Sequence, residues 1–192
     1  LCIYSPQENV DSLKHPKIKN WIEFIKKDWE PNPTPKGYKR LALIIPCTKY
    51  KPYITSREHK AINSSLLMDG WEPIGESNAP SELTKFIEDG DDPKIFHEGS
   101  LKKGNLILDR IVISEPLGLV PYEYIYFWKG EQSPATSYDD PGLFESRGTS
   151  ISPYRDDCTA LKVGDKKWKW GDSERNSYVY MHNYLAELIA FS

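Results

Sequence analysis

The fold is decided by one stretch, Leu41 to His59, which reads LALIIPCTKYKPYITSREH. Residues 41–45 form a wholly apolar run of strand length, which is typical of a parallel strand buried on both faces. Pro46 cannot donate to a sheet, so the strand should end there. Pro52 disfavours helix up to about Tyr53, and Thr55 or Ser56 suits a helix N-cap. The stretch therefore predicts a strand, a rigid polar loop and a helix.

A second apolar strand is expected at residues 110–114, which include Ile111-Val112-Ile113. The following loop, Glu115–Pro121, contains two prolines and a glycine, which argue against a regular element. We expect residues 41–45 and 110–114 to be neighbouring parallel strands in the sheet interior. Their two loops would then line a common cleft, because ligands bind at the carboxyl ends of strands in open α/β sheets.

Periodicity predicts the other elements. A helix from Pro16 to Trp29 carries one apolar stripe, a helix spans Arg57 to about Met68, and a short helix spans Pro80 to Asp89. Glu123 to Trp128 is a candidate strand. A last helix should run from Ser173 toward Phe191, with these side chains inward: Tyr178, Met181, Leu185, Leu188 and Ile189.

Buried strands that alternate with helices predict an α/β domain of three layers. The length of 192 residues suits a single domain, 1–192. Within it we distinguish an N-terminal helix and proline-rich connector (1–40), a core (41–145) and a divergent segment with the C-terminal helix (146–192).

The composition favours a cytoplasmic protein. The three cysteines, Cys2, Cys47 and Cys158, are far apart in the sequence and odd in number, which fits a reduced compartment better than a disulfide scaffold. No apolar run reaches the roughly eighteen residues of a membrane helix, and Leu1 leaves the true N-terminus open. No metal-binding cysteine spacing is present, so neither metal nor cofactor is expected.

The charge is unevenly distributed. Residues 36–60 hold seven Lys or Arg and one acid, a net of +6, within a chain of net charge -3. A basic focus on an acidic body suits an anionic ligand, although ordinary solvated lysines would give the same count. The tract from Lys166 to Gly171 combines lysines with two tryptophans; it suits either single-stranded nucleic acid or a surface hairpin.

The loop after the first strand carries the candidate chemistry. Cys47 has Lys49, Lys51 and His59 nearby in the sequence, and cationic neighbours favour a nucleophilic thiolate. The lysines could equally bind phosphate beside the helix N-terminus. A buried structural cysteine and a histidine bonded to the backbone remain the alternative.

The motif PCxxxKPYxxSxxH, complete here from Pro46 to His59, resembles the signature of archaeosine synthase, a paralogue of archaeal tRNA-guanine transglycosylase. The stretches ISEPLGLVP (113–121) and PATSYDDP (134–141) are similar to further segments of that family. The resemblance spans roughly residues 15–145. It implies a uracil-DNA glycosylase-like α/β/α sandwich with a mainly parallel, roughly four-stranded sheet.

The activity implied by the resemblance is tRNA modification, in which an amine such as lysine adds to the nitrile of a 7-cyano-7-deazaguanine (preQ0) base in tRNA. The implied catalytic residues are Cys47, Lys51, Tyr53, Ser56 and His59. The substrate-binding candidates are Lys49, Arg57, Glu115, Leu117, Gly118, Tyr138 and Asp139.

The family's transglycosylase-like and PUA domains have no counterpart in the sequence, so we expect a stand-alone module or a split subunit with a partner that carries them. The alternative is a non-catalytic RNA-binding or partner-binding subunit that uses Lys49, Lys51, Arg57 and the tract at Trp168–Trp170. A nucleobase glycosylase is a weaker alternative, because fold does not fix function and the first loop has no acid to activate water.

Overall fold

The structure is a computed structural model that describes residues 3–136, 151–165 and 167–191. The chain forms two compact units that interleave in the sequence. The first unit comprises residues 1–29, 114–118 and 137–192, and the second comprises residues 30–113 and 119–136.

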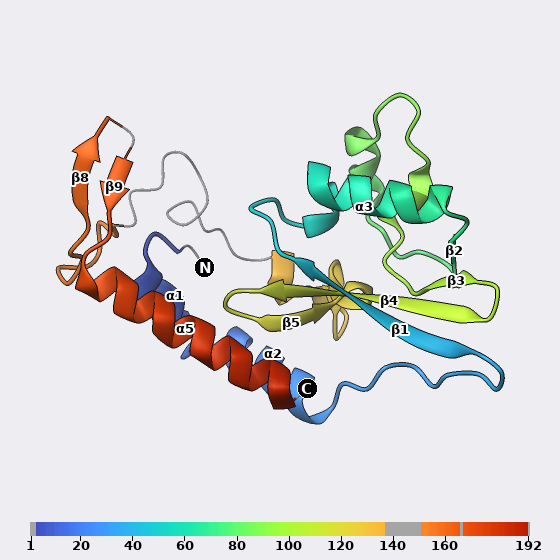
Figure 1. The fold of residues 1–192 in the computed structure, drawn as a ribbon, viewed down its shortest axis with the longest axis horizontal. Helices are drawn as coiled ribbons and strands as arrows, with labels where there is room; N and C mark the ends of the chain where they lie inside the picture. The colour runs from blue at the N-terminus through green and yellow to red at the C-terminus, as the bar shows by residue number, and fades with distance from the viewer. Residues whose placement is uncertain (1–2, 137–150, 166, 192) are drawn as a thin grey trace. The chain divides into compact units, whose positions relative to one another are not determined.

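The second unit contains a mixed sheet with the order β1-β4-β3-β2, in which β5 also pairs with β4. Its strands are β1 (Lys39–Pro46), β2 (Glu72–Pro73), β3 (Leu101–Lys103), β4 (Leu106–Ser114) and β5 (Gly118–Pro121). Helix α3 (Arg57–Met68) lies over one face of this sheet (Figure 1). The protein is therefore of the mixed α/β class.

The central pairing expected from the sequence is present. Strands β1 and β4 are parallel neighbours, with Leu41 opposite Leu108 and Ile45 opposite Val112. The expectation of a mainly parallel sheet is wrong, because β3 is antiparallel to both β4 and β2. The two residues between β3 and β4 explain this: Gly104 has a φ of 58°, so a tight hairpin turns the chain back on itself.

The expectation that β1 lies in the sheet interior is also wrong. In the described sheet β1 is the end strand and pairs with β4. Ile45 is 1% exposed, but Leu41 and Ile44 are 43% and 49% exposed. An apolar run indicates that its residues favour a strand. The position of that strand in the sheet depends on partners that are distant in the sequence.

Three further segments differ from their predicted structures. Residues 118–121 form strand β5 where an irregular loop was expected. The predicted helix at Pro80–Asp89 is a 3₁₀ helix, η2 (Ser81–Phe86). The predicted strand at Glu123–Trp128 consists of a 3₁₀ helix and a short strand: η4 (Tyr122–Tyr124) and β6 (Phe127–Trp128), which pairs with β7 (Glu131–Gln132). Further 3₁₀ helices are η1 (Tyr53–Thr55), η3 (Pro93–Phe96) and η5 (Pro134–Thr136).

An apolar cluster fills the space between α3 and the sheet. It is formed by Trp71, Leu101 and Leu108, with three partly buried leucines packed against it: Leu43, Leu66 and Leu106. The fully buried residues of α3, however, are both polar: His59 and Asn63. That polar pair leads to the candidate site.

The first unit is mainly helical, with α1 (Pro6–Ser12), α2 (Pro16–Lys27) and α5 (Asp172–Phe191), and a hairpin of β8 (Leu161–Gly164) and β9 (Lys167–Lys169). The stripe predicted for this helix is confirmed for Ile18, Trp21, Ile22 and Ile25, which are buried. Its last member, Trp29, lies beyond the end of α2 and is only partly buried. Residues Lys167–Lys169 of the basic–aromatic tract form β9 of this hairpin, which is one of the two structures considered for the tract.

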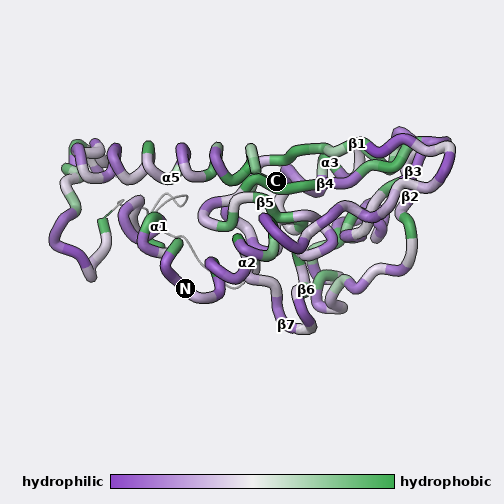
Figure 2. Tube along the Cα trace, turned by 90° about the horizontal axis from the view of Figure 1, so that it is seen from below, coloured by the Kyte–Doolittle hydropathy of each residue, from purple (hydrophilic) through white to green (hydrophobic). Residues whose placement is uncertain are grey.

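Helix α5 has the predicted extent, and its residues alternate between hydrophobic and hydrophilic along its length (Figure 2). Met181, Leu185 and Leu188 are buried, but Tyr178 and Ile189 are exposed and were wrongly expected to face inward. None of the helices in the described ranges is long and apolar enough to cross a membrane.

Near the start of α5 the first unit is held by a buried carboxylate. Glu174 is 0% exposed and accepts hydrogen bonds from the Gln7 amide (2.8 Å), from the N–H and hydroxyl of Thr159 (both 2.8 Å) and from the Gly171 N–H (3.0 Å). Burial acts to raise the pKa of Glu174, but these hydrogen bonds outweigh it and the pKa is lowered. The ionised carboxylate thus ties α1 and the segment before α5 together.

Candidate functional site

The site begins where β1 ends. The N–H of Cys47 donates a 3.0 Å hydrogen bond to the carbonyl of Ile113, so Cys47 extends the parallel pairing of β1 with β4 by one residue. Cys47 is not in a disulfide, and the residue is partly exposed. The cysteine therefore stands at the carboxyl edge of the sheet, as the sequence predicted.

Lys51 folds back across the loop that follows Cys47. Its ammonium donates a 2.8 Å hydrogen bond to the carbonyl of Thr48 and lies 5.5 Å from the centre of the Tyr53 ring. The Tyr53 ring itself is 0% exposed. Lys49 is exposed, with its ammonium 5.2 Å from the centre of the Tyr50 ring. Both lysines of the loop thus lie beside tyrosine faces.

Ser56 is the N-cap of α3, and it is one of the two residues predicted for this position. Its hydroxyl accepts a 3.1 Å hydrogen bond from the N–H of His59, and its side chain is fully buried. A serine cap satisfies one of the N–H groups that a helix leaves open at its start. The cap fixes where α3 begins and thereby fixes the position of His59 in its first turn.

His59 connects this first turn to the end of β1. Its Nε2 lies 3.0 Å from the carbonyl oxygen of Pro46, and its Nδ1 lies 2.6 Å from the hydroxyl of Tyr122. A carbonyl can only accept, so Nε2 carries the proton and Nδ1 accepts from Tyr122. Burial is the largest cause that lowers the pKa of His59, so the ring is neutral at neutral pH.

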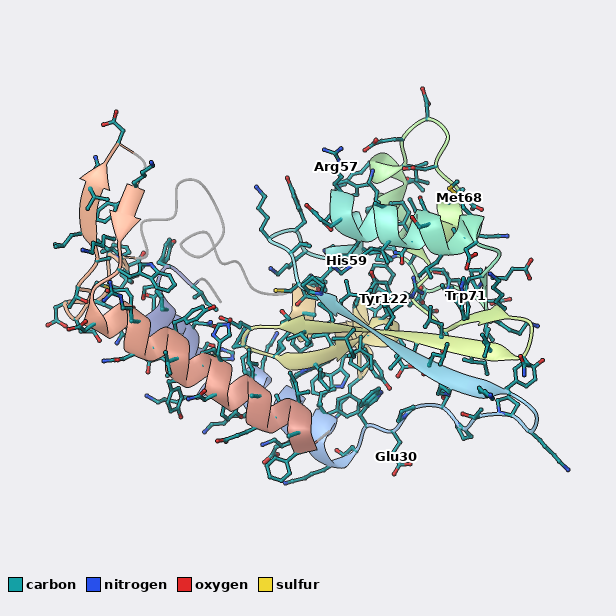
Figure 3. All side chains as sticks on the ribbon, viewed as in Figure 1. Glu30, Arg57, His59, Met68, Trp71 and Tyr122 are labelled. Carbon is teal, nitrogen blue, oxygen red and sulfur yellow. The ribbon has the colours of Figure 1, made fainter. Side chains whose placement is uncertain are left out.

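Tyr122 is the partner that the sequence did not reveal. Its ring stacks on His59 with 5.9 Å between centroids and 5° between planes, and Tyr53 stacks on His59 at 6.0 Å. Burial raises the pKa of Tyr122 to about 12, so its hydroxyl is protonated and able to donate. Figure 3 shows His59 and Tyr122 together between α3 and the sheet.

Behind Tyr122 lies Arg110, which is 2% exposed. Its guanidinium carbon is 4.4 Å from the centre of the Tyr122 ring. It donates hydrogen bonds to Asn63 Oδ1 (2.7 Å), to the His97 carbonyl (2.7 Å) and to the Gly99 carbonyl (2.6 Å). Burial lowers its pKa to about 10, which leaves the guanidinium charged at neutral pH.

One signal in the sequence pointed to Arg110. With Asp109 it interrupts the apolar residues of β4, and a charge is placed in such a strand when it has buried partners. No comparable local signal pointed to Tyr122 or Asn63, because their partners lie in other segments of the chain.

The structure thus brings five of the predicted residues into one loop and helix start: Cys47, Lys51, Tyr53, Ser56 and His59. Arg57 is exposed at the start of α3 and points away from the sheet (Figure 3). Tyr138 and Asp139 lie outside the described residues.

The other three predicted residues belong to the first unit. The Glu115 carboxylate accepts from Asn9 Nδ2 and lies 3.2 Å from Nε2 of His182. Leu117 is fully buried, and Gly118 has a φ of 78°. The cleft predicted between Cys47 and Glu115–Pro121 spans the two units and stays a prediction.

Chemically, the loop offers the thiol of a partly exposed cysteine, an ammonium group held at its base and a neutral, buried imidazole. Within residues 3–136, 151–165 and 167–191, no three His, Cys, Asp or Glu side chains gather in a group that could hold a metal ion. Comparison of the chain with models of protein families, with curated proteins and with solved structures gave no match.

Proposed function

We propose that the Pro46–His59 loop is the active site of a tRNA-modifying enzyme module that adds an amine to the nitrile of a preQ0-type base, as its motif implies. The observation that carries this proposal is a partly exposed cysteine, Cys47, at the carboxyl end of β1, on a loop held by buried hydrogen bonds. In the proposal the domain has the three-layer, uracil-DNA glycosylase-like architecture of that family.

The proposed chemistry uses two additions. The Cys47 thiolate attacks the nitrile carbon to form a carbon–sulfur bond, and the nitrile nitrogen takes a proton to give a thioimidate. A neutral amine then attacks the same carbon, and the tetrahedral adduct expels the thiolate to leave an amidine. Covalent catalysis of this kind divides one difficult addition into two easier steps. No oxidant or reductant is required.

The other motif residues have distinct roles in this proposal. The Lys51 ammonium, held 2.8 Å from the Thr48 carbonyl in the same loop, favours the thiolate and donates the proton in this proposal. His59 is one of the catalytic residues that the motif implies. Both of its ring nitrogens are engaged and it is fully buried, which supports a positioning role. Ser56 and Tyr53 hold the loop and the start of α3.

The test is incubation of the chain with preQ0-containing tRNA and labelled lysine, with and without transglycosylase-like and PUA-containing partners, followed by nucleoside mass spectrometry. We expect labelled amidine nucleoside with the native chain and none with Cys47→Ser. Cys158→Ser is the matched control, because Cys158 is also a partly exposed free cysteine. Full turnover by Cys47→Ser would refute the role of Cys47 as the nucleophile.

A non-catalytic RNA-binding subunit is the second candidate. It is favoured by the exposure of Lys49 and Arg57 in the second unit, and by exposed Lys167 and Lys169 on the hairpin of the first unit. In the same experiment, salt-dependent tRNA binding without turnover under any partner condition would select this function over the enzymatic one.

A further inference from the structure

The second unit contains a cavity of about 450 Å³ to which the Leu41–His59 stretch contributes no lining residue. Its walls include two carboxylates, four aromatic rings and one ammonium group. The residues that matter for its chemistry are Glu98, Glu123, Tyr124, Tyr126, Trp128 and Lys129. A volume of this size lies in the range of small-ligand sites, roughly 300–1,000 Å³.

A buried carboxylate is the first unusual feature of the cavity. Glu98 is 5% exposed, and its two oxygens accept 2.6 Å hydrogen bonds from the Ser77 hydroxyl and the Asn78 N–H. Both donors are neutral, and within the described part of the chain no lysine or arginine forms an ion pair with Glu98. Buried charges are normally paired. Glu98 is oriented by neutral donors, and it has the electrostatic attraction of the buried Arg110 guanidinium but, among the described residues, no ion pair of its own.

The two carboxylates of the cavity act on the neighbouring tyrosines, in addition to the larger effect of burial. Burial, followed by the charge of Glu98, raises the pKa of Tyr126. Burial, followed by the charge of Glu123, raises the pKa of Tyr124. The Tyr126 hydroxyl donates a 2.7 Å hydrogen bond to the Phe96 carbonyl, which fixes the orientation of this ring in the wall.

The wall formed by Trp128 already accommodates a cation. The Lys129 ammonium lies 4.7 Å from the centre of the Trp128 ring, within the roughly 6 Å at which a cation is attracted to an aromatic face. Lys129 has a φ of 51°, in the left-handed region that residues other than glycine rarely adopt. The β6–β7 turn thus holds a lysine in an unfavourable conformation beside this ring.

We propose that this cavity binds an alkylammonium ligand, an aliphatic chain with a terminal ammonium group. The ammonium group pairs with the Glu98 carboxylate, and the hydrocarbon chain lies along the rings of Tyr124, Tyr126 and Trp128. Two carboxylates against one ammonium give the lining a net negative charge, which excludes anions. Neutral ligands of the same shape lose the ion pair. The proposal does not depend on the proposed function.

The test uses n-pentylammonium as the probe, with 1-pentanol as its neutral isostere and pentanoate as the anion. Binding to the full chain is followed by the ¹H–¹⁵N signal of the Trp128 indole and by ligand-observed NMR. We expect saturable binding of pentylammonium, binding of pentanol about tenfold weaker or less, which corresponds to about 1.4 kcal/mol, and none of pentanoate.

Variants connect the binding to the named groups. Glu98→Gln removes the charge but keeps the size of the side chain, and should weaken pentylammonium binding about tenfold while leaving pentanol binding unchanged. The matched control is Glu82→Gln, an exposed acid of the same unit outside the cavity, which should change neither. If Glu98→Gln does not fold, the comparison of the three probes on the native chain still tests whether the cavity binds an alkylammonium ligand. Equal affinity for pentanol and pentylammonium, or no shift of the Trp128 signal, overturns the proposal.

Discussion

His59 and Tyr122, 63 residues apart in the chain, share a 2.6 Å hydrogen bond between Nδ1 and the tyrosine hydroxyl. The other ring nitrogen of His59 donates to the carbonyl of Pro46, which is the last residue of β1 and directly precedes Cys47. One side chain thus couples the end of β1, the first turn of α3 and the segment after β5. The conformation of the Cys47 loop depends on this buried connection.

Removal of the Tyr122 hydroxyl should destabilise the second unit. Tyr122→Phe leaves Nδ1 of His59 buried without its donor, which should cost about 1–3 kcal/mol of unfolding free energy. Urea denaturation measures the change. Tyr50→Phe is the control, because Tyr50 is 52% exposed and its change should stay within about 0.5 kcal/mol. Equal effects of the two substitutions would refute the structural role of the bond.

The buried neutral imidazole predicts a pH dependence of stability. Burial lowers the pKa of His59 in the folded state below its ordinary value of 6.5. The unfolded chain therefore binds more protons below that value, so the free energy of unfolding should fall as the pH drops from 7 toward 5. His59→Gln should flatten this slope in urea titrations at several pH values. A variant with the same slope as the native chain would show that other groups cause it.

Gly118 should tolerate alanine much less well than Gly70 does. Both have a positive φ, 78° and 84°, but a Cβ at Gly118 would lie 2.0 Å from Cδ2 of the buried Leu188, whereas nothing lies within 4 Å at Gly70. We expect Gly70→Ala to cost about 1 kcal/mol, and Gly118→Ala to cost a further 1–3 kcal/mol because of overpacking. Thermal unfolding of the two variants compares them directly, and similar melting temperatures would contradict the packing around Leu188.

Cys47 should be the more reactive of the two described cysteines. A thiolate on a loop that also carries Lys49 and Lys51 should react rapidly with iodoacetamide near neutral pH, with an apparent pKa below the roughly 8.5 of a free thiol. Peptide mass spectrometry of the alkylated chain gives both rates at once, with Cys158 as the internal reference. Cys47→Ser should leave tRNA affinity unchanged. Reaction of Cys47 no faster than that of Cys158 would favour a packing role for the thiol.

The affinity of the chain for tRNA should fall steeply with salt, because lysines release counterions when they contact phosphates. Lys49→Ala and Lys51→Ala should each weaken binding and reduce the slope of log affinity against log salt by about one. Lys85→Ala is a control, since Lys85 is an exposed lysine of the same unit outside the basic focus. Binding that does not respond to salt, or a Lys85 effect as large as that of Lys49, would remove the basic focus from tRNA recognition.

The sequence by itself determined the local elements whose signals span a few residues. The serine cap and the proline before it define the start of α3, and the apolar stripes of α2 and the centre of α5 define their buried faces. The parallel pairing of β1 with β4 also followed from the sequence, because two apolar runs separated by a helix favour it. Five candidate residues lie together for the same reason, since they belong to one loop and one helix start.

The tertiary structure decided what depends on partners distant in the sequence. The place of β1 at the end of the sheet, the Tyr122 hydroxyl on His59 and the Arg110 guanidinium behind the Tyr122 ring all join separate segments. The cavity around Glu98 likewise combines three segments: residues 78–79, Glu98 and residues 123–130. Caps and periodicity act between neighbouring residues, whereas burial and hydrogen-bond pairing are set by whichever segments the folded chain brings together. For that reason the motif could be located from the sequence, and the buried network that holds it could not.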